Sequence, residues 1–160
     1  MAKQINTAKQ KAWKRAEARV IQFADKLGKG VDKGIRETVV GLNALGINTS
    51  SSCEGHLNWG TGAPYIDIEA NNKGPAKLKK NVKRNQREIQ KVLLLLDKFY
   101  NNHKAPFDRR LTIQAWGWSI GRLESQGVAV LDALPKAAKA KKLKEYQKEM
   151  TSFGKFLKKQ

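Results

Sequence analysis

The sequence predicts an α+β protein, a four-stranded antiparallel or mixed sheet with helices packed on it. Segments with apolar residues at every third or fourth position alternate with short segments in which every second residue is apolar. The short segments come in pairs joined by glycine-containing turns, a spacing typical of neighbouring strands. We expect a single domain over residues 1–160, with a basic N-terminal helix in 1–30, an α+β core in 31–130 and a basic C-terminal helix in 131–160.

The first two helices are indicated by their apolar stripes and by the glycines that follow them. Residues 3–27 contain good helix formers, and glycines just beyond this segment would end the helix. In residues 33–45 the apolar side chains lie on one face, and Asp32 is placed to cap the helix. Trp13 lies among basic residues. It would either dock the first helix on the core, which we favour, or stack on a nucleic-acid base.

The remaining elements follow from the same two periods. We expect strands over 47–53 and 64–70, a helix over 75–101, a loop over 101–108, strands over 111–116 and 122–125, and a helix that opens at Pro135 and weakens at Gly154. The four strands should form one sheet under the helices of 33–45 and 75–101. The side chains expected to be buried together are Ile66, Ile68, Leu111, Ile113, Leu42, Val92 and Leu96.

The net charge of +18 is concentrated in the segments predicted to be helical. Such a field attracts phosphate polyanions, although a lysine-rich helix surface can also serve only to keep a protein in solution. Lysine outnumbers arginine, which favours that second interpretation. The side chains predicted to contact nucleic acid are Lys11, Lys14, Arg15, Lys79, Lys80, Lys83, Arg84 and Arg87.

Residues 46–70 are the exception, because they carry Glu54, Asp67 and Glu69 but no lysine or arginine. Gly55 allows a sharp turn between Glu54 and His56, so both side chains could project into a cleft at the end of the first strand. The alternative is a hydrogen-bonded loop corner. The residues predicted to line a ligand-binding cleft are Ser52, Cys53, Glu54, His56, Tyr65, Asp67, Gln114, Trp116, Arg122 and Glu124.

Cys53 is the only cysteine and permits three interpretations. It could be a small buried residue at a strand end, a nucleophile with His56 as its base, or one ligand of a metal site with His56 as another. The further metal candidates along the chain are Glu54, Asp67, Glu69 and His103. Because none of these completes a recognisable spacing, the sequence assigns no metal ligand and no catalytic residue.

Residues Thr49–His56, TSSSCEGH, resemble the T-T-S-S-C-(S/A)-G-R signature of the wybutosine-synthesising tRNA methyltransferases. Ser51, Ser52, Cys53 and Gly55 match, whereas Glu54 replaces a small residue and His56 replaces the arginine. The resemblance covers about 40 residues. It implies a related fold, an RNA substrate and, by resemblance only, S-adenosylmethionine as a cofactor.

A second resemblance spans most of the chain. Small uncharacterised proteins of phages and uncultured bacteria carry S-C-E-G-H, P-(W/Y)-(I/V)-D-I and R-L-x-x-Q-G. These motifs are matched here by residues 52–56, 64–68 and 122–127. This resemblance implies a shared fold and attaches no activity to it.

The sequence therefore predicts a small basic protein that binds nucleic acid, with RNA as the expected form. The alternatives are an RNA-modifying enzyme and a nucleotide- or protein-binding module whose charge is incidental, so the question of an enzyme stays open. No run of 18 apolar residues occurs, which predicts no membrane partner. The single cysteine and the lack of a secretory pattern lead us to expect a cytoplasmic protein of unknown oligomeric state.

Overall fold

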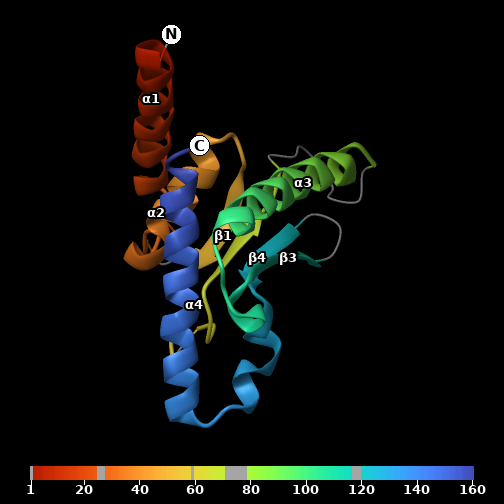
Figure 1. Ribbon diagram of the computed structural model, residues 1–160. Helices are drawn as coiled ribbons and strands as arrows, with labels where there is room; N and C mark the ends of the chain where they lie inside the picture. Colours follow the sequence, from red (N-terminus) through yellow and green to blue (C-terminus); the bar gives the residue numbers. More distant parts are fainter. Residues whose placement is uncertain (1, 25–27, 59, 71–78, 117–119) are drawn as a thin grey trace.

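The computed structural model describes residues 2–24, 28–58, 60–70, 79–116 and 120–160. The predicted α+β fold is confirmed, with helices packed on a four-stranded sheet (Figure 1). In chain order the elements are α1 (Ala2–Ile21), α2 (Lys33–Ala44), β1 (Thr49–Cys53), β2 (Tyr65–Ile68), α3 (Lys79–Asn102), the 3₁₀ helix η1 (Phe107–Arg109), β3 (Leu111–Trp116), β4 (Ile120–Ser125), the 3₁₀ helix η2 (Gln126–Ala133) and α4 (Lys136–Leu157). Of the predicted helix over 75–101, residues 75–78 lie outside the described part.

The sheet has the strand order β1-β2-β4-β3, and every neighbouring pair is antiparallel. Directly opposed residues share a face. Leu123 therefore lies on the same face as its partners Ile66 and Ile113, whereas Arg122 lies on the other face with its partners Asp67 and Gln114. The first face is apolar and the second is polar, and this alternation places the candidate ligand-binding residues of β2, β3 and β4 together.

Helices α2 and α3 pack on the sheet, and α4 packs on α2. One cluster joins side chains of all four α-helices to β2, β3 and β4. The expected core is present, but Ile113 is only partly buried. Trp13 is partly buried against this cluster with the Lys158 ammonium over its ring, so it docks α1 on the core as favoured.

The prediction that the first helix runs to residue 27 is wrong, because α1 ends at Ile21. The chain turns at Gln22, and Ala24 then forms an isolated bridge with Gly30. Phe23 packs against the core from this irregular segment. Its apolar side chain continued the helical period without belonging to the helix. Within the described residues, no helix is long and apolar enough to cross a membrane.

Strand β1 departs from simple alternation, which would place Thr49, Ser51 and Cys53 on one side. A register shift between Thr49 and Ser51 sets Thr49 and Ser52 opposite Ile68 and Ile66, on the apolar face. Ser51 and Cys53 consequently share the polar face with Asp67 and Tyr65. The bulge therefore separates Thr49 from Ser51 and Cys53, which by their pairing belong to the side of the sheet that carries the polar residues.

Candidate functional site

The loop after β1 is folded back on itself and held against α4. Gly55 has φ +83°, a conformation that favours glycine. The next residue, His56, donates its backbone N–H to the Thr61 carbonyl at 2.8 Å. From α4, Gln147 donates its amide to the Glu54 carbonyl at 3.0 Å. The backbone of this corner is thus fixed from both sides, which limits where the side chains beside it can lie.

Glu54 and Asp32 exchange the roles that the sequence suggested for them. Asp32 occupies the N-cap position of α2, yet its side chain makes no capping hydrogen bond there. The Glu54 carboxylate accepts the Gly34 N–H at 2.7 Å instead, and so stabilises the first turn of α2. The Asp32 carboxylate accepts the backbone N–H of Glu54 at 3.1 Å. The Glu54 side chain therefore caps α2, and the Asp32 side chain points towards the loop after β1.

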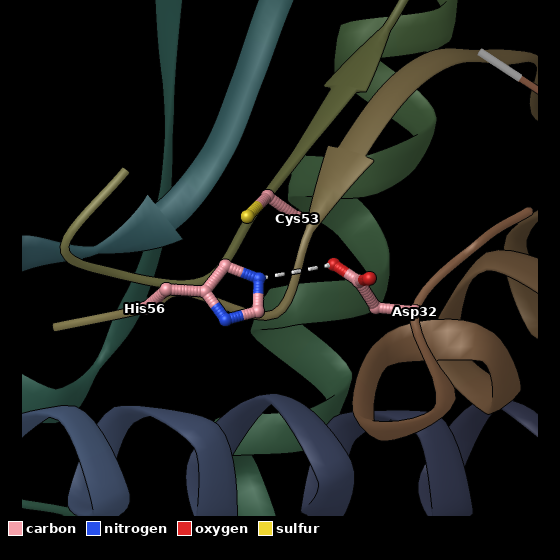
Figure 2. A group of neighbouring side chains, drawn as sticks. All are labelled: Asp32, Cys53 and His56. Carbon is pink, nitrogen blue, oxygen red and sulfur yellow. Dashed lines mark ion pairs between the residues drawn. The ribbon is translucent and has the colours of Figure 1, made fainter. Parts of the chain in front are cut away.

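This orientation brings Asp32 to Cys53 and His56 (Figure 2). The His56 Nε2 and Asp32 Oδ2 atoms are 3.6 Å apart. One carboxylate oxygen, the sulfur and one ring nitrogen all lie within 4.8 Å of one another. Among the described residues, these are the ones that could together hold a metal ion. Asp32 is not among the residues that the sequence predicts for the site, because it lies 21 positions before Cys53 and has the place of an ordinary helix cap.

The cluster borders a groove of about 660 Å³, a size suited to a small molecule. Asp32 and Cys53 line the groove together with the segment before α2, the length of β1, Thr61 and Tyr65. Ser52, another predicted cleft residue, also lines it. A ligand in this groove would thus meet the sulfur and a carboxylate at one end and hydroxyl groups along its side.

The geometry differs from that of a Cys–His–Asp relay. In such a relay the imidazole lies between its partners and uses its two nitrogens separately, which places the sulfur and the carboxylate on the order of 7 Å apart. Here the His56 Nε2 and Asp32 Oδ2 atoms are 3.6 Å apart, and the Cys53 sulfur lies within 4.8 Å of a ligand atom of each, which is closer than a relay would place the sulfur and the carboxylate. Three ligand atoms this close together suit a shared cation better than a proton relay.

A second polar group lies on the open face of the sheet. The Arg122 guanidinium donates to both Asp67 oxygens, at 2.7 and 2.9 Å, and lies 4.0 Å above the Tyr65 ring centroid. The hydrogen bond to Asp67 raises the pKa of Arg122, so the guanidinium stays protonated. Asp67 is almost fully buried, which is permissible for a charge because Arg122 satisfies both oxygens. Arg122 is thereby held in place by its neighbours.

Glu124 flanks this pair two residues along β4, and Gln114 lies opposite Arg122 on β3. Glu124 is half-buried, and desolvation raises the pKa of its carboxyl group. Gln114 is exposed, and the Trp116 side chain lies outside the described part. The predicted cleft residues therefore divide between the groove and the open face, and Tyr65 belongs to both.

The other histidine lies in a separate network. His103 contacts the Glu149 carboxylate at 3.1 Å, and the Tyr100 hydroxyl donates to the same carboxylate at 2.9 Å. Burial raises the pKa of Tyr100. The Tyr100 oxygen accepts the Leu111 N–H, which ties α3, α4 and β3 together. This network stabilises the helix packing and contributes nothing to the groove.

The predicted nucleic-acid contacts are all exposed, but they lie on two helices. Lys11, Lys14 and Arg15 belong to α1, and the rest belong to α3. Figure 1 shows these helices at different sides of the molecule, α1 projecting upwards and α3 extending to the right. The two groups would therefore contact a short polyanion separately.

Comparison with known proteins adds no relative to this description. No family model matches the chain, and neither the curated proteins nor the solved structures yield a match. The geometry of the chain itself is therefore the basis for inferring a function.

Proposed function

We propose that the protein binds RNA through the basic face of α3. The observation that carries this proposal is a row of exposed cations over the first turns of the helix: Lys79, Lys80, Lys83, Arg84 and Arg87. At about 100° and 1.5 Å per residue, they cover roughly 140° of the helix surface and about 12 Å of its length. No carboxylate lies between residues 79 and 87 of this helix.

The opposite face of α3 explains why this row is presented to solvent. Asn85 accepts the Ala70 N–H at 3.0 Å, and Glu88 accepts the Asn48 N–H at 3.4 Å. Both side chains are buried and fix the rotation of the helix about its axis. Lys91 donates to Glu88 at 2.8 Å and so is partly neutralised. Within the described residues the five cations before it make no ion pair, which leaves them available for phosphate groups.

Two further features support RNA as the polyanion. The net charge of +18 favours association with any nucleic acid, with an affinity that falls with salt. The resemblance of residues 49–56 to a tRNA-modifying family favours RNA over DNA. The lysine-rich composition favours backbone contacts over base-specific bidentate contacts, so weak sequence selectivity is expected.

The test is fluorescence anisotropy of a labelled single-stranded RNA, titrated at several salt concentrations. The triple variant Lys83→Ala/Arg84→Ala/Arg87→Ala should weaken binding and reduce the slope of log affinity against log salt by about 2, since each phosphate contact contributes about 0.7 for a single strand. These side chains are exposed, so stability should change by less than about 0.5 kcal/mol per substitution. Circular dichroism checks that the variant stays folded.

The matched control removes the same number of charges from α1, as Lys11→Ala/Lys14→Ala/Arg15→Ala. It should retain most of the affinity if α3 is the interface. Equal losses in the two variants would show that only net charge matters, and no binding at low salt would contradict the proposed function altogether. Equal affinity for duplex DNA would reduce the proposal to general polyanion binding.

A further inference from the structure

The cluster of Asp32, Cys53 and His56 combines three chemically different ligand types in one place. Each comes from a different local setting: the residue before α2, the last residue of β1 and the loop that follows. Figure 2 shows the Asp32 carboxylate facing the imidazole ring of His56 and the Cys53 sulfur beside the same ring. A carboxylate, a thiolate and an imidazole are all established zinc ligands.

The distances fit a tetrahedral ion after a small adjustment. Zinc–nitrogen and zinc–oxygen bonds of about 2.0–2.2 Å at a tetrahedral angle place the two ligand atoms about 3.4 Å apart. A zinc–sulfur bond of about 2.3 Å raises the separation from sulfur to about 3.6 Å. The separation between His56 and Asp32 is already 3.6 Å, and all three atoms lie within 4.8 Å of one another. If the ligand atoms that lie farthest apart approached each other by about 1 Å, all three separations would match those around a tetrahedral zinc ion.

Backbone groups around the cluster already orient two of these ligands. The Glu54 N–H donates to the Asp32 carboxylate at 3.1 Å, and the Gly55 N–H donates to the Cys53 sulfur at 3.3 Å. Donors of this kind fix the direction of a metal ligand and stabilise its anionic form. Glu54 caps α2 in place of Asp32, so the Asp32 carboxylate is not needed by its own helix.

We propose that Asp32, Cys53 and His56 bind one zinc ion and leave its fourth position open to the groove. Zinc suits a mixed set of sulfur, nitrogen and oxygen ligands, whereas magnesium and calcium prefer oxygen alone. Three protein ligands with an open position are typical of zinc sites that bind water or a substrate. The thiol of Cys53 loses its proton to solvent as the sulfur–metal bond forms. The fourth ligand is water or an oxygen of a small molecule in the groove.

Cys53 makes a direct test possible, because it is the only thiol in the chain. The untagged full-length protein is stripped with a chelator and titrated with zinc against a chromophoric competitor, and with cobalt while the absorption of the cobalt–thiolate bond is recorded. One equivalent should bind, the thiolate absorption should appear, and zinc should slow alkylation of Cys53 at least about tenfold. Failure of zinc to protect the thiol, or absence of the cobalt–thiolate absorption, would overturn the proposal.

Three single variants, Asp32→Asn, Cys53→Ser and His56→Gln, each remove one ligand. Each should weaken zinc binding by more than about 100-fold, because even loss of a hydrogen bond to a metal ligand costs about 10–100-fold. Asp97→Asn, the same change as Asp32→Asn at an exposed position of α3, is the matched control and should leave the affinity unchanged. An unchanged affinity in the ligand variants would place the zinc elsewhere and reject this site. If a variant fails to fold, the protection of Cys53 by zinc in the wild-type protein still tests whether zinc binds at this site.

The zinc proposal does not depend on nucleic-acid binding. The ligands lie at the groove beside β1, whereas the cations proposed to contact RNA lie on α3. Loss of RNA binding in the α3 variant should leave zinc affinity unchanged. A protein that binds zinc but no RNA would support this site and contradict only the proposed function.

Discussion

Arg122 organises the open face of the sheet. It lies in the centre of the sheet on β4, donates two hydrogen bonds to Asp67 and covers the Tyr65 ring. These contacts neutralise one buried carboxylate. Within the described residues, the carboxylate of Glu124, two residues along the same strand, accepts no such hydrogen bond. Burial raises the pKa of Glu124, and the nearby Asp67 charge adds to the effect while Arg122 opposes it. Ionised Glu124 is therefore unfavourable in the fold.

We expect Glu124→Gln to stabilise the protein at neutral pH. Because the folded-state pKa is raised above the unfolded value of about 4.3, the folded protein holds this proton more tightly, and stability falls as pH rises through that interval. Glutamine has no such ionisation. The gain in the free energy of unfolding should be present at pH 7 and disappear near pH 4, as measured by urea denaturation across this range. A gain that does not vary with pH would contradict this explanation.

At the scale of elements, the corner after β1 depends on a glycine in a confined space. A Cβ added to Gly55 would lie 2.7 Å from the Ala63 carbonyl carbon and 2.8 Å from both Leu143 Cδ1 and Pro64 N. Gly55 therefore meets two constraints, a positive φ and close contact with its neighbours. Gly46 has a similar φ of +74°, but nothing lies within 4 Å of the corresponding position. Substitutions at the two glycines can therefore distinguish the cost of a strained backbone from the cost of crowding.

Gly55→Ala should destabilise the protein by well over the roughly 1–3 kcal/mol that the left-handed conformation alone costs a residue with a side chain. Gly46→Ala should cost only that amount. Chemical denaturation of both variants gives the difference, which measures the crowding around the corner. Similar losses in the two proteins would mean that the loop moves freely enough to accept a methyl group, and the fixed position of Cys53 and His56 would then be in doubt.

Much of this arrangement could be predicted from periodicity, because α2, α3 and the strands each keep one apolar face. The end of α1 at Ile21 could not be predicted, because Phe23 keeps the spacing of the helical apolar residues although it lies outside the helix. The place of Asp32 in the cluster with Cys53 and His56 could not be predicted either, because its contact with His56 depends on the docking of α2 against β1.

The sequence predicts that Gly154 weakens the last helix, yet α4 continues to Leu157. A Cβ there would lie 2.6 Å from Thr38 Oγ1, so Gly154 allows the close approach of α2.

At the scale of the whole molecule, one core connects the terminal helices to the sheet. Phe153 of α4 is fully buried and contacts Phe99 of α3 with a centroid distance of 5.3 Å. On its other side α4 packs closely on α2, where the Thr38 hydroxyl donates to the Met150 carbonyl at 2.9 Å. The end of α4 lies beside α1 (Figure 1), and Lys158 covers Trp13. A second, smaller cluster of Ala63, Leu131 and Tyr146 packs η2 against the first half of α4.

We therefore expect the chain to unfold in a single transition that Phe153→Ala shifts as a whole. Deleting a buried phenylalanine costs about 3–5 kcal/mol, a large part of the roughly 5–15 kcal/mol that stabilises a domain. Because Phe153 belongs to the cluster that also holds α1 and the sheet, the loss should appear equally in helix content by circular dichroism and in amide hydrogen exchange of β2 and β4. Exchange protection that stays high in the strands while helix content falls would show that the terminal helices unfold independently and that the domain is smaller than residues 1–160.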